Sequence, residues 1–184
     1  CPWSDGTATF NSVSAVVLGV AGTRAGEHAR KFLGIDTGVP ASGWHGALVC
    51  DDYSGYKASF EHGIVEAGCL AHARRKFHEL WANHQSTLAE QALKYFGALY
   101  DVERKVQLLS AEERGRIRQV EAEPSAKNFH AWLKAQRGRV PDGSATAKAI
   151  DYSLKRWAAL TRYLGDGNLP CDNNWVENQI RPIA

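Results

Sequence analysis

The chain of 184 residues lacks methionine altogether, even at position 1, and begins with Cys1. It also lacks a signal peptide and any apolar run near the roughly 20 residues that a membrane-spanning helix requires. These absences exclude a predicted membrane segment, and we expect a cytoplasmic protein. The sequence stops at Ala184 in the middle of a pattern, so we expect a piece of a longer protein.

Cysteine is scarce and widely spaced, with four residues in the chain. Cys50 and Cys69 lie in apolar runs, which favours buried, reduced thiols over disulfides. Cys69 and His72 have the two-residue gap of half a zinc site, but no second half follows, so we expect no zinc. A buried Cys beside a His that donates to backbone or carboxylate fits equally well. A glycine-rich phosphate loop is excluded too, because neither Gly-x-Gly-x-x-Gly nor a Walker lysine is present.

The net charge of +2 implies no partner, but its distribution is uneven. Before Arg74 the chain has 4 Lys and Arg against 7 Asp and Glu, a balance of −3. Residues 74–162 contain 17 against 10, a balance of +7. An acidic pole followed by a basic middle suits a metal site beside a phosphate-binding surface. A solvated helical surface explains the same pattern.

The first 69 residues alternate between predicted strands and short helices. Apolar, β-branched runs predict strands at 13–20, 47–50 and 64–69, with helices at 28–33 and 53–62 between them. This alternation is typical of an α/β layer with at least partly parallel strands.

From Leu70 onward the sequence has helical periodicity. We predict helices over 71–81 and 88–109, another that a capping box opens at Ser110 and that stops before Pro124, then 125–136, and a long last helix over 144–164. The predicted organisation is therefore a partial α/β core over 1–69, a basic helical insertion over 70–165, and a returning helix over 166–184.

Asp51 and Glu177 form the candidate metal site. Asp51 follows an apolar strand, and Glu177 lies on a predicted helix capped by Asp172 or Asn173, sharing one polar face with Arg181. Carboxylates are preferred ligands of Mg²⁺ and Mn²⁺, and two such ions support phosphodiester chemistry. The alternative is that Asp51 and Asp52 cap a helix while Glu177 pairs with Arg181.

The basic run Arg74, Arg75 and Lys76 could contact phosphates or simply be solvated. Three tryptophans could stack on bases, but their helical spacing favours core packing; these are Trp81, Trp132 and Trp157.

Five blocks in one order resemble the insertion-sequence-66 type transposases, which are bacterial mobile-element proteins of the DDE class. They are residues 24–33 (RAGEHARKFL), 48–56 (LVCDDYSGY), 68–77 (GCLAHARRKF), 142–157 (DGSATAKAIDYSLKRW) and 172–182 (DNNWVENQIRP). The resemblance implies an RNase H-like core that a large helical insertion interrupts before the last catalytic helix.

The resemblance also implies roles for particular residues. Asp51 would be the second acid of the catalytic triad and Glu177 the third, with the first upstream of position 1. Together they would hold two Mg²⁺ or Mn²⁺ ions for cleavage and strand transfer of double-stranded DNA. Residues expected to contact DNA or support the acids are Asp52, His72, Arg74, Arg75, Lys76, Asn173, Asn174 and Arg181.

Two other functions stay open at this point. One is an inactive DNA-binding or assembly fragment of such an element, and the other is a stand-alone RNase H-like nuclease. A homo-oligomer is a further expectation, because transposases generally work as multimers on paired DNA ends.

Overall fold

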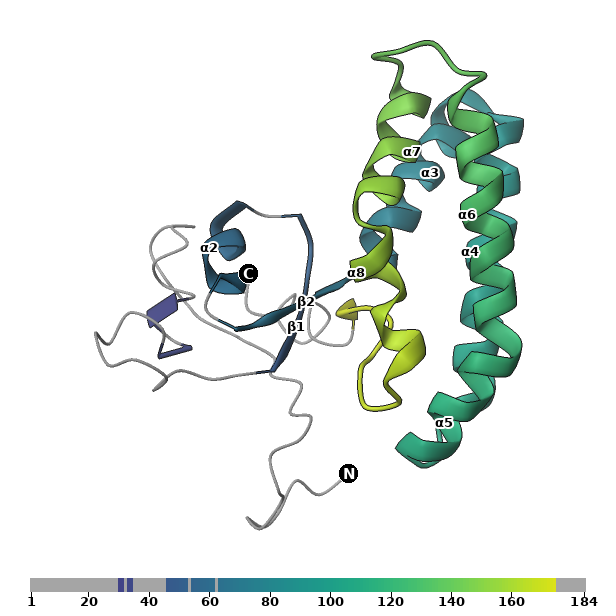
Figure 1. Ribbon diagram of the computed structural model, residues 1–184. Coiled ribbons are helices and arrows are strands. Elements are labelled where there is room, and N and C mark those ends of the chain that lie inside the picture. The colour runs from purple at the N-terminus through teal and green to yellow at the C-terminus, as the bar shows by residue number, and fades with distance from the viewer. Residues whose placement is uncertain (1–29, 32, 35–45, 53, 62, 175–184) are drawn as a thin grey trace.

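The computed structural model describes residues 30–31, 33–34, 46–52, 54–61 and 63–174. These residues form a helix-rich α/β arrangement, in which a small parallel sheet stands beside a bundle of long helices (Figure 1). The strand predicted over 13–20 and most of the returning helix lie outside the described residues, as does much of the helix predicted over 28–33.

The sheet consists of β1 (Ala47–Cys50) and β2 (Val65–Gly68), which pair in parallel from Ala47 opposite Val65 to Cys50 opposite Gly68. Two short helices, η1 (Ser54–Tyr56) and α2 (Lys57–Phe60), lie in the connection between them. Gly63 follows with a φ of 88°, a left-handed conformation that glycine adopts readily and that redirects the chain into β2. The predictions of both strands and of their parallel pairing are therefore confirmed.

The sheet is covered on both faces. Leu48 and Cys50 pack in a cluster with Leu33 and Ile64. The alternate residues of β1, Ala47 and Val49, contact the main core, which also contains Ala67 of β2. Alternation along a strand sends successive side chains to opposite faces, so β1 joins two apolar layers.

The helical part is a four-helix bundle of α3 (Leu70–His84), α4 (Thr87–Val106), α6 (Glu123–Arg137) and α7 (Ala145–Lys155) (Figure 1). Helix α3 packs against α4 and α7, and α6 packs against the same two helices, so α3 and α6 lie diagonally opposite. Phe77, Phe96 and Phe129 are buried at the centre, with Phe96 meeting Phe77 at 5.9 Å and Phe129 at 5.0 Å between ring centroids.

Serine side chains begin three of the helices. Ser86, Ser110 and Ser144 each accept a hydrogen bond from the backbone N–H three residues later, at 3.0–3.2 Å. The hydroxyl of Ser110 also donates to Glu113, which confirms the predicted helix start at this serine.

The helix predicted to stop before Pro124 instead runs through it. Helix α5 (Ala111–Ile117) passes into the π-helical turn η2 (Arg118–Ala122) and then directly into α6. In this turn the N–H of Glu123 reaches the carbonyl of Arg118. The wider turn shifts the hydrogen-bond register just before Pro124, which lacks an N–H, and thereby allows the helix to continue.

The last long helix predicted over 144–164 is divided into three pieces. Helix α7 ends at Lys155, α8 covers Trp157–Thr161, and η3 covers Arg162–Gly165. Arg156 separates the first two with φ −103° and ψ 12°. Helix α8 packs on β2, and Leu160 lies against Gly68, so the break turns the chain from the bundle onto the sheet.

The tryptophans divide between core and surface. Trp132 and Trp157 are partly buried against the main core, as predicted. Trp81 has 38% of its surface exposed and stands beside His78, so its predicted core position is wrong. The adjacent Leu80 is buried, so Trp81 lies on the outer side of α3.

The helical stretch of the described residues begins at Leu70 and ends at Gly165. Its core is continuous with one face of the sheet, because Ala67 and Leu160 belong to the same cluster. None of the helices that the structure describes has the length and apolarity needed to cross a membrane.

Candidate metal and DNA site at the strand ends

Asp51 lies immediately after β1, at the carboxyl end of the sheet, and is half-buried. The carbonyl of the preceding Cys50 accepts a hydrogen bond from the N–H of Cys69 at 3.2 Å. The carbonyl of Asp51 itself accepts one from Nη2 of Arg156 at 3.2 Å. The backbone is therefore held on both sides of the Asp51 Cα atom, at an edge where α/β proteins commonly bind ligands.

The neighbouring Asp52 is exposed and takes part in ion pairs. Its Oδ1 lies 2.6 Å from Nη1 of Arg156 and 3.9 Å from Nζ of Lys57. Arg156 also reaches Oε1 of Glu66 at 2.7 Å. The sequence prediction of a supporting role for Asp52 is consistent with these pairs.

Arg156 keeps its charge although only 9% of its surface is exposed. Burial opposes the charged form, but the carboxylates of Glu66 and Asp52 outweigh it and raise the pKa of Arg156. Its guanidinium stands 5.6 Å from the Tyr152 ring centroid. Burial, with smaller contributions from nearby charges, raises the pKa of Tyr152 to about 12, so this ring is neutral at physiological pH.

The basic run on α3 begins one turn into the helix and is exposed. Nζ of Lys76 lies 4.5 Å from the centroid of the Tyr152 ring, the same ring that Arg156 contacts. Arg74 and Arg75 are exposed beside it. Tyr152 therefore contacts both this basic run and Arg156, which links the run spatially to the turn that contains Asp51 and Asp52.

The returning segment also reaches the strand ends. The thiol of Cys69 donates to Oδ1 of Asn173 at 2.9 Å, and the N–H of Leu70 donates to the carbonyl of Cys171 at 3.0 Å. Because Cys69 is in turn bonded to the carbonyl of Cys50, the end of β1, the end of β2 and Asn173 lie together. The predicted pairing of Asp51 with Glu177 implies such a meeting of segments.

Asp172 connects the returning segment to the bundle. Its Oδ2 accepts a hydrogen bond from the hydroxyl of Tyr100 at 2.7 Å, while its Oδ1 accepts from the N–H of Asn174 at 3.1 Å. Asp172, one of the two predicted cap residues, thus accepts a hydrogen bond from the backbone that follows it. Burial, together with the Asp172 carboxylate, raises the pKa of Tyr100 well above its usual range, so the phenol remains a donor.

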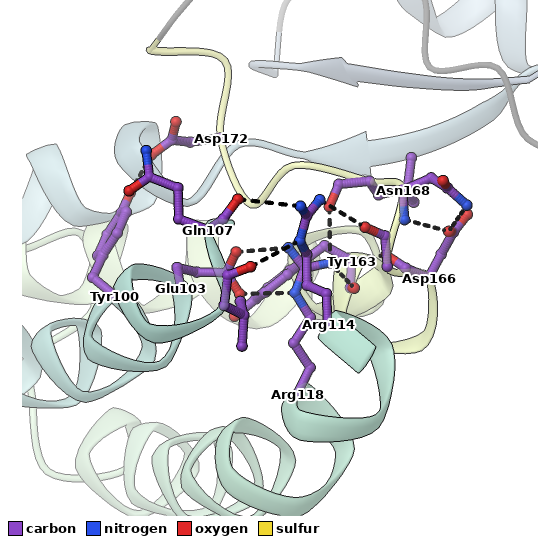
Figure 2. A network of polar contacts seen from close by, with 12 residues as sticks. Tyr100, Glu103, Gln107, Arg114, Arg118, Tyr163, Asp166, Asn168 and Asp172 are labelled. Carbon is purple, nitrogen blue, oxygen red and sulfur yellow. Dashed lines mark hydrogen bonds and ion pairs between the residues drawn. The ribbon is translucent and has the colours of Figure 1, made fainter. Parts of the chain in front are cut away.

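A buried arginine network holds the same segment further upstream, as Figure 2 shows. Arg118 forms a double contact with Glu103, at 2.8 and 2.6 Å, and donates to three backbone carbonyls of the segment 163–169. Arg114 donates to the carbonyl of Gly167 at 3.0 Å. Sequence reasoning missed these residues because arginines at helical spacing resemble a solvated face.

Cys50 and Cys69 are buried and free, as predicted, and Cys171 is also buried and free. Burial is the main cause that raises the pKa of each thiol, to about 12 for Cys50. His72 lies half-buried in the first turn of α3. Within the described ranges, no group of three or more His, Cys, Asp or Glu residues is arranged to hold a metal ion.

Glu177 and Arg181 lie outside the described residues, so the predicted pairing of Asp51 with Glu177 remains a prediction. The structure does bring Asp51 and Asn173 to one edge of the sheet, and it places Asp52 in an ion pair there. A half-buried carboxylate at this edge is the kind of oxygen donor that Mg²⁺ and Mn²⁺ prefer, so the donor present fits such an ion.

Comparison with known proteins assigns the chain to a family. The family model described as "Transposase IS66 family" matches residues 3–184. The chain therefore belongs to the IS66 family of transposases.

Similar proteins from Sinorhizobium fredii are described as uncharacterized proteins. The protein y4hP is 34% identical over 92% of this chain and 32% of its own length. The protein y4qI is 38% identical over 77% of this chain and 28% of its own length. The chain thus spans about a third of these relatives or slightly less, and no solved structure matches it significantly.

Proposed function

We propose that this chain is the central catalytic part of a DDE-class DNA transposase, with an RNase H-like core interrupted by the helical bundle. In this proposal, 1–69 and 166–184 form the core and 70–165 the insertion. Family membership and a parallel sheet with helices on its faces support this assignment.

The observation that carries the proposal is the convergence of two distant segments at one sheet edge. Asp51 ends β1, and Asn173 is bonded to Cys69 at the end of β2. Glu177 follows Asn173 by four residues, which is about one helical turn, or roughly 6 Å along a helix. A helix beginning here would keep Glu177 within about a turn of the edge that bears Asp51.

In the proposed site, Asp51 and Glu177 bind Mg²⁺ or Mn²⁺, together with a first acid upstream of position 1. When bound, such ions would supply charge stabilisation for phosphodiester cleavage and strand joining. In this proposal Asn173, which the thiol of Cys69 holds, would fix the start of a helix that carries Glu177. Arg181 orients Glu177 or contacts a phosphate.

The proposed DNA surface is the exposed basic run on α3, Arg74, Arg75 and Lys76. It begins six residues after β2 and contacts Tyr152 beside the Asp51 turn. Double-stranded DNA bound along this helix would pass close to the carboxylates. Assembly of several copies on paired DNA ends is part of the same proposal.

The test is metal-dependent cleavage of duplex DNA that carries the element end. The protein is expressed with whatever flanking sequence its gene encodes, and single-turnover rates are measured for Asp51→Asn, Glu177→Gln and the control Asp142→Asn. Asp142 is a suitable control because its side chain is 91% exposed on the loop before α7. We expect each site variant to lose at least about 100-fold, since ions contribute several kcal/mol and about 1.4 kcal/mol is tenfold. Near-normal cleavage by either site variant would refute the proposal.

A further inference from the structure

We propose that Arg156 is a positioning residue that fixes the Asp51 backbone and withholds the adjacent Asp52 from the metal. This inference rests on the proposed function, because it assumes that Asp51 is a metal ligand. It adds a residue from the helical part, which the sequence analysis did not assign to the site.

The hydrogen bonds and ion pairs of the Arg156 side chain go to the turn after β1 and to β2. Its two terminal nitrogens bond Oδ1 of Asp52 at 2.6 Å, the carbonyl of Asp51 at 3.2 Å and Oε1 of Glu66 at 2.7 Å. Glu66 belongs to β2, so a single guanidinium joins the turn after β1 to the neighbouring strand. The planar, multi-donor group of arginine is suited to such a bridge, whereas the single ammonium of lysine is not.

The bridge has two consequences for Asp51. Arg156 holds the carbonyl of Asp51, and the N–H of Cys69 holds the carbonyl of the preceding residue. The position of the Asp51 Cα atom, from which the side chain extends, is therefore fixed. Asp52 is neutralised as an ion pair, which removes a competing carboxylate one residue away. The two adjacent acids therefore differ in their availability to a metal ion, and Asp51 is the proposed ligand.

The location of Arg156 in the chain supports this role. It stands at the break between α7 and α8, where the helical part turns onto β2. A buried arginine carries a large desolvation cost, and here three oxygen acceptors, two from the turn after β1 and one from β2, offset it. A surface residue of a solvated helix would need no such arrangement.

The test is a titration of Mn²⁺ into the ¹⁵N-labelled full chain, following paramagnetic broadening of the backbone amides around residues 50–52. The wild type is compared with Arg156→Gln, Arg156→Lys and Asp51→Asn, and Arg139→Gln serves as control because Arg139 is exposed beyond the end of α6. The amide spectrum of each variant reports whether its fold is retained.

Loss of residues that orient metal ligands commonly weakens metal binding by about 10–100-fold. We expect about tenfold weaker Mn²⁺ binding for Arg156→Gln, a smaller loss for Arg156→Lys, and no change for Arg139→Gln. Adding Asp52→Asn to Arg156→Gln should restore part of the affinity, because the released competitor is removed. A purely structural role would not produce this recovery.

Wild-type Mn²⁺ binding by folded Arg156→Gln would overturn the positioning role. If that variant does not fold, wild-type binding by folded Arg156→Lys has the same meaning. Unchanged binding by Asp51→Asn is a different failure, because it removes Asp51 from the metal site and refutes the proposed function together with this inference.

Discussion

Two buried arginines, Arg118 and Arg156, carry charge into the interior where separate segments of the chain meet. Arg156 joins the two strands to the break between α7 and α8. Arg118 joins α4 and the π-helical turn to the segment 163–169 that leads toward Asn173. At the scale of single residues, Arg118 holds the segment that leads toward Asn173, and Arg156 holds the turn that contains Asp51.

Replacing Arg118 with methionine should destabilise the chain by about 3–5 kcal/mol, because Glu103 would be left as an uncompensated charge, mostly buried, and three carbonyls would lose their donor. Urea unfolding followed by circular dichroism measures the free energy of unfolding. Arg116→Ala, two residues away and exposed, should change it by no more than about 0.5 kcal/mol. Equal effects of the two substitutions would show that the network contributes little.

At the scale of elements, the contact between α8 and β2 joins the bundle to the sheet. A Cβ atom at Gly68 would lie 3.0 Å from both the backbone nitrogen and Cδ2 of Leu160. Glycine at this position therefore permits the helix to approach the strand closely. The fit depends on backbone, which cannot shift as easily as the end of a side chain.

Gly68→Ala should consequently reduce the free energy of unfolding by about 1–3 kcal/mol through overpacking. Gly97→Ala is the matched control, because Gly97 lies inside α4 with no atom within 4 Å of the added Cβ. It should increase stability by about 0.5–1 kcal/mol, since alanine favours the helix. Thermal and urea unfolding of both variants test the contact, and a neutral Gly68→Ala would contradict it.

The elements that local signals specify were predictable from the sequence. The apolar run at Ala47–Cys50 and the serines at 110 and 144 marked a strand and two helix starts that the structure contains. The π-helical turn before Pro124 and the break at Arg156 were not predictable, because they depend on contacts with distant segments. For the same reason, Arg118 and Arg156 resembled surface residues, while Asp51 was found from its position after a strand.

At the scale of the whole molecule, the bundle carries both ion-paired acids and an exposed basic run. Several acids of the bundle are paired with its lysines, within one helix in Lys94–Glu90 and Lys127–Glu123 and between α4 and η2 in Lys105–Glu121. The basic run on α3 is exposed, and its Lys76 reaches Tyr152 of α7. This division supports α3 as the surface that a polyanion approaches.

Replacing Arg74, Arg75 and Lys76 together with alanine should weaken binding to duplex DNA of any sequence and make it less salt-dependent. Each lost phosphate contact reduces the slope of log affinity against log salt by about 0.9, so a reduction of up to about 3 is expected. Fluorescence anisotropy over a range of salt concentrations measures this slope.

The control is the triple alanine variant at Lys127, Lys134 and Arg139, which removes the same charge from α6 and the loop that follows it, diagonally opposite α3. It should leave the slope nearly unchanged. Equal slopes for the two triple variants would show that DNA is not held on α3.

The central claim, that Asp51 binds the catalytic metal, is tested most directly by Asp51→Cys in DNA cleavage with Mg²⁺ and with Mn²⁺. Mg²⁺ requires hard oxygen ligands and tolerates a thiolate poorly, whereas Mn²⁺ accepts one more readily. We predict that this variant is inactive with Mg²⁺ and recovers activity with Mn²⁺, while Asp51→Asn recovers with neither. Wild-type cleavage by Asp51→Cys in Mg²⁺ would contradict the assignment.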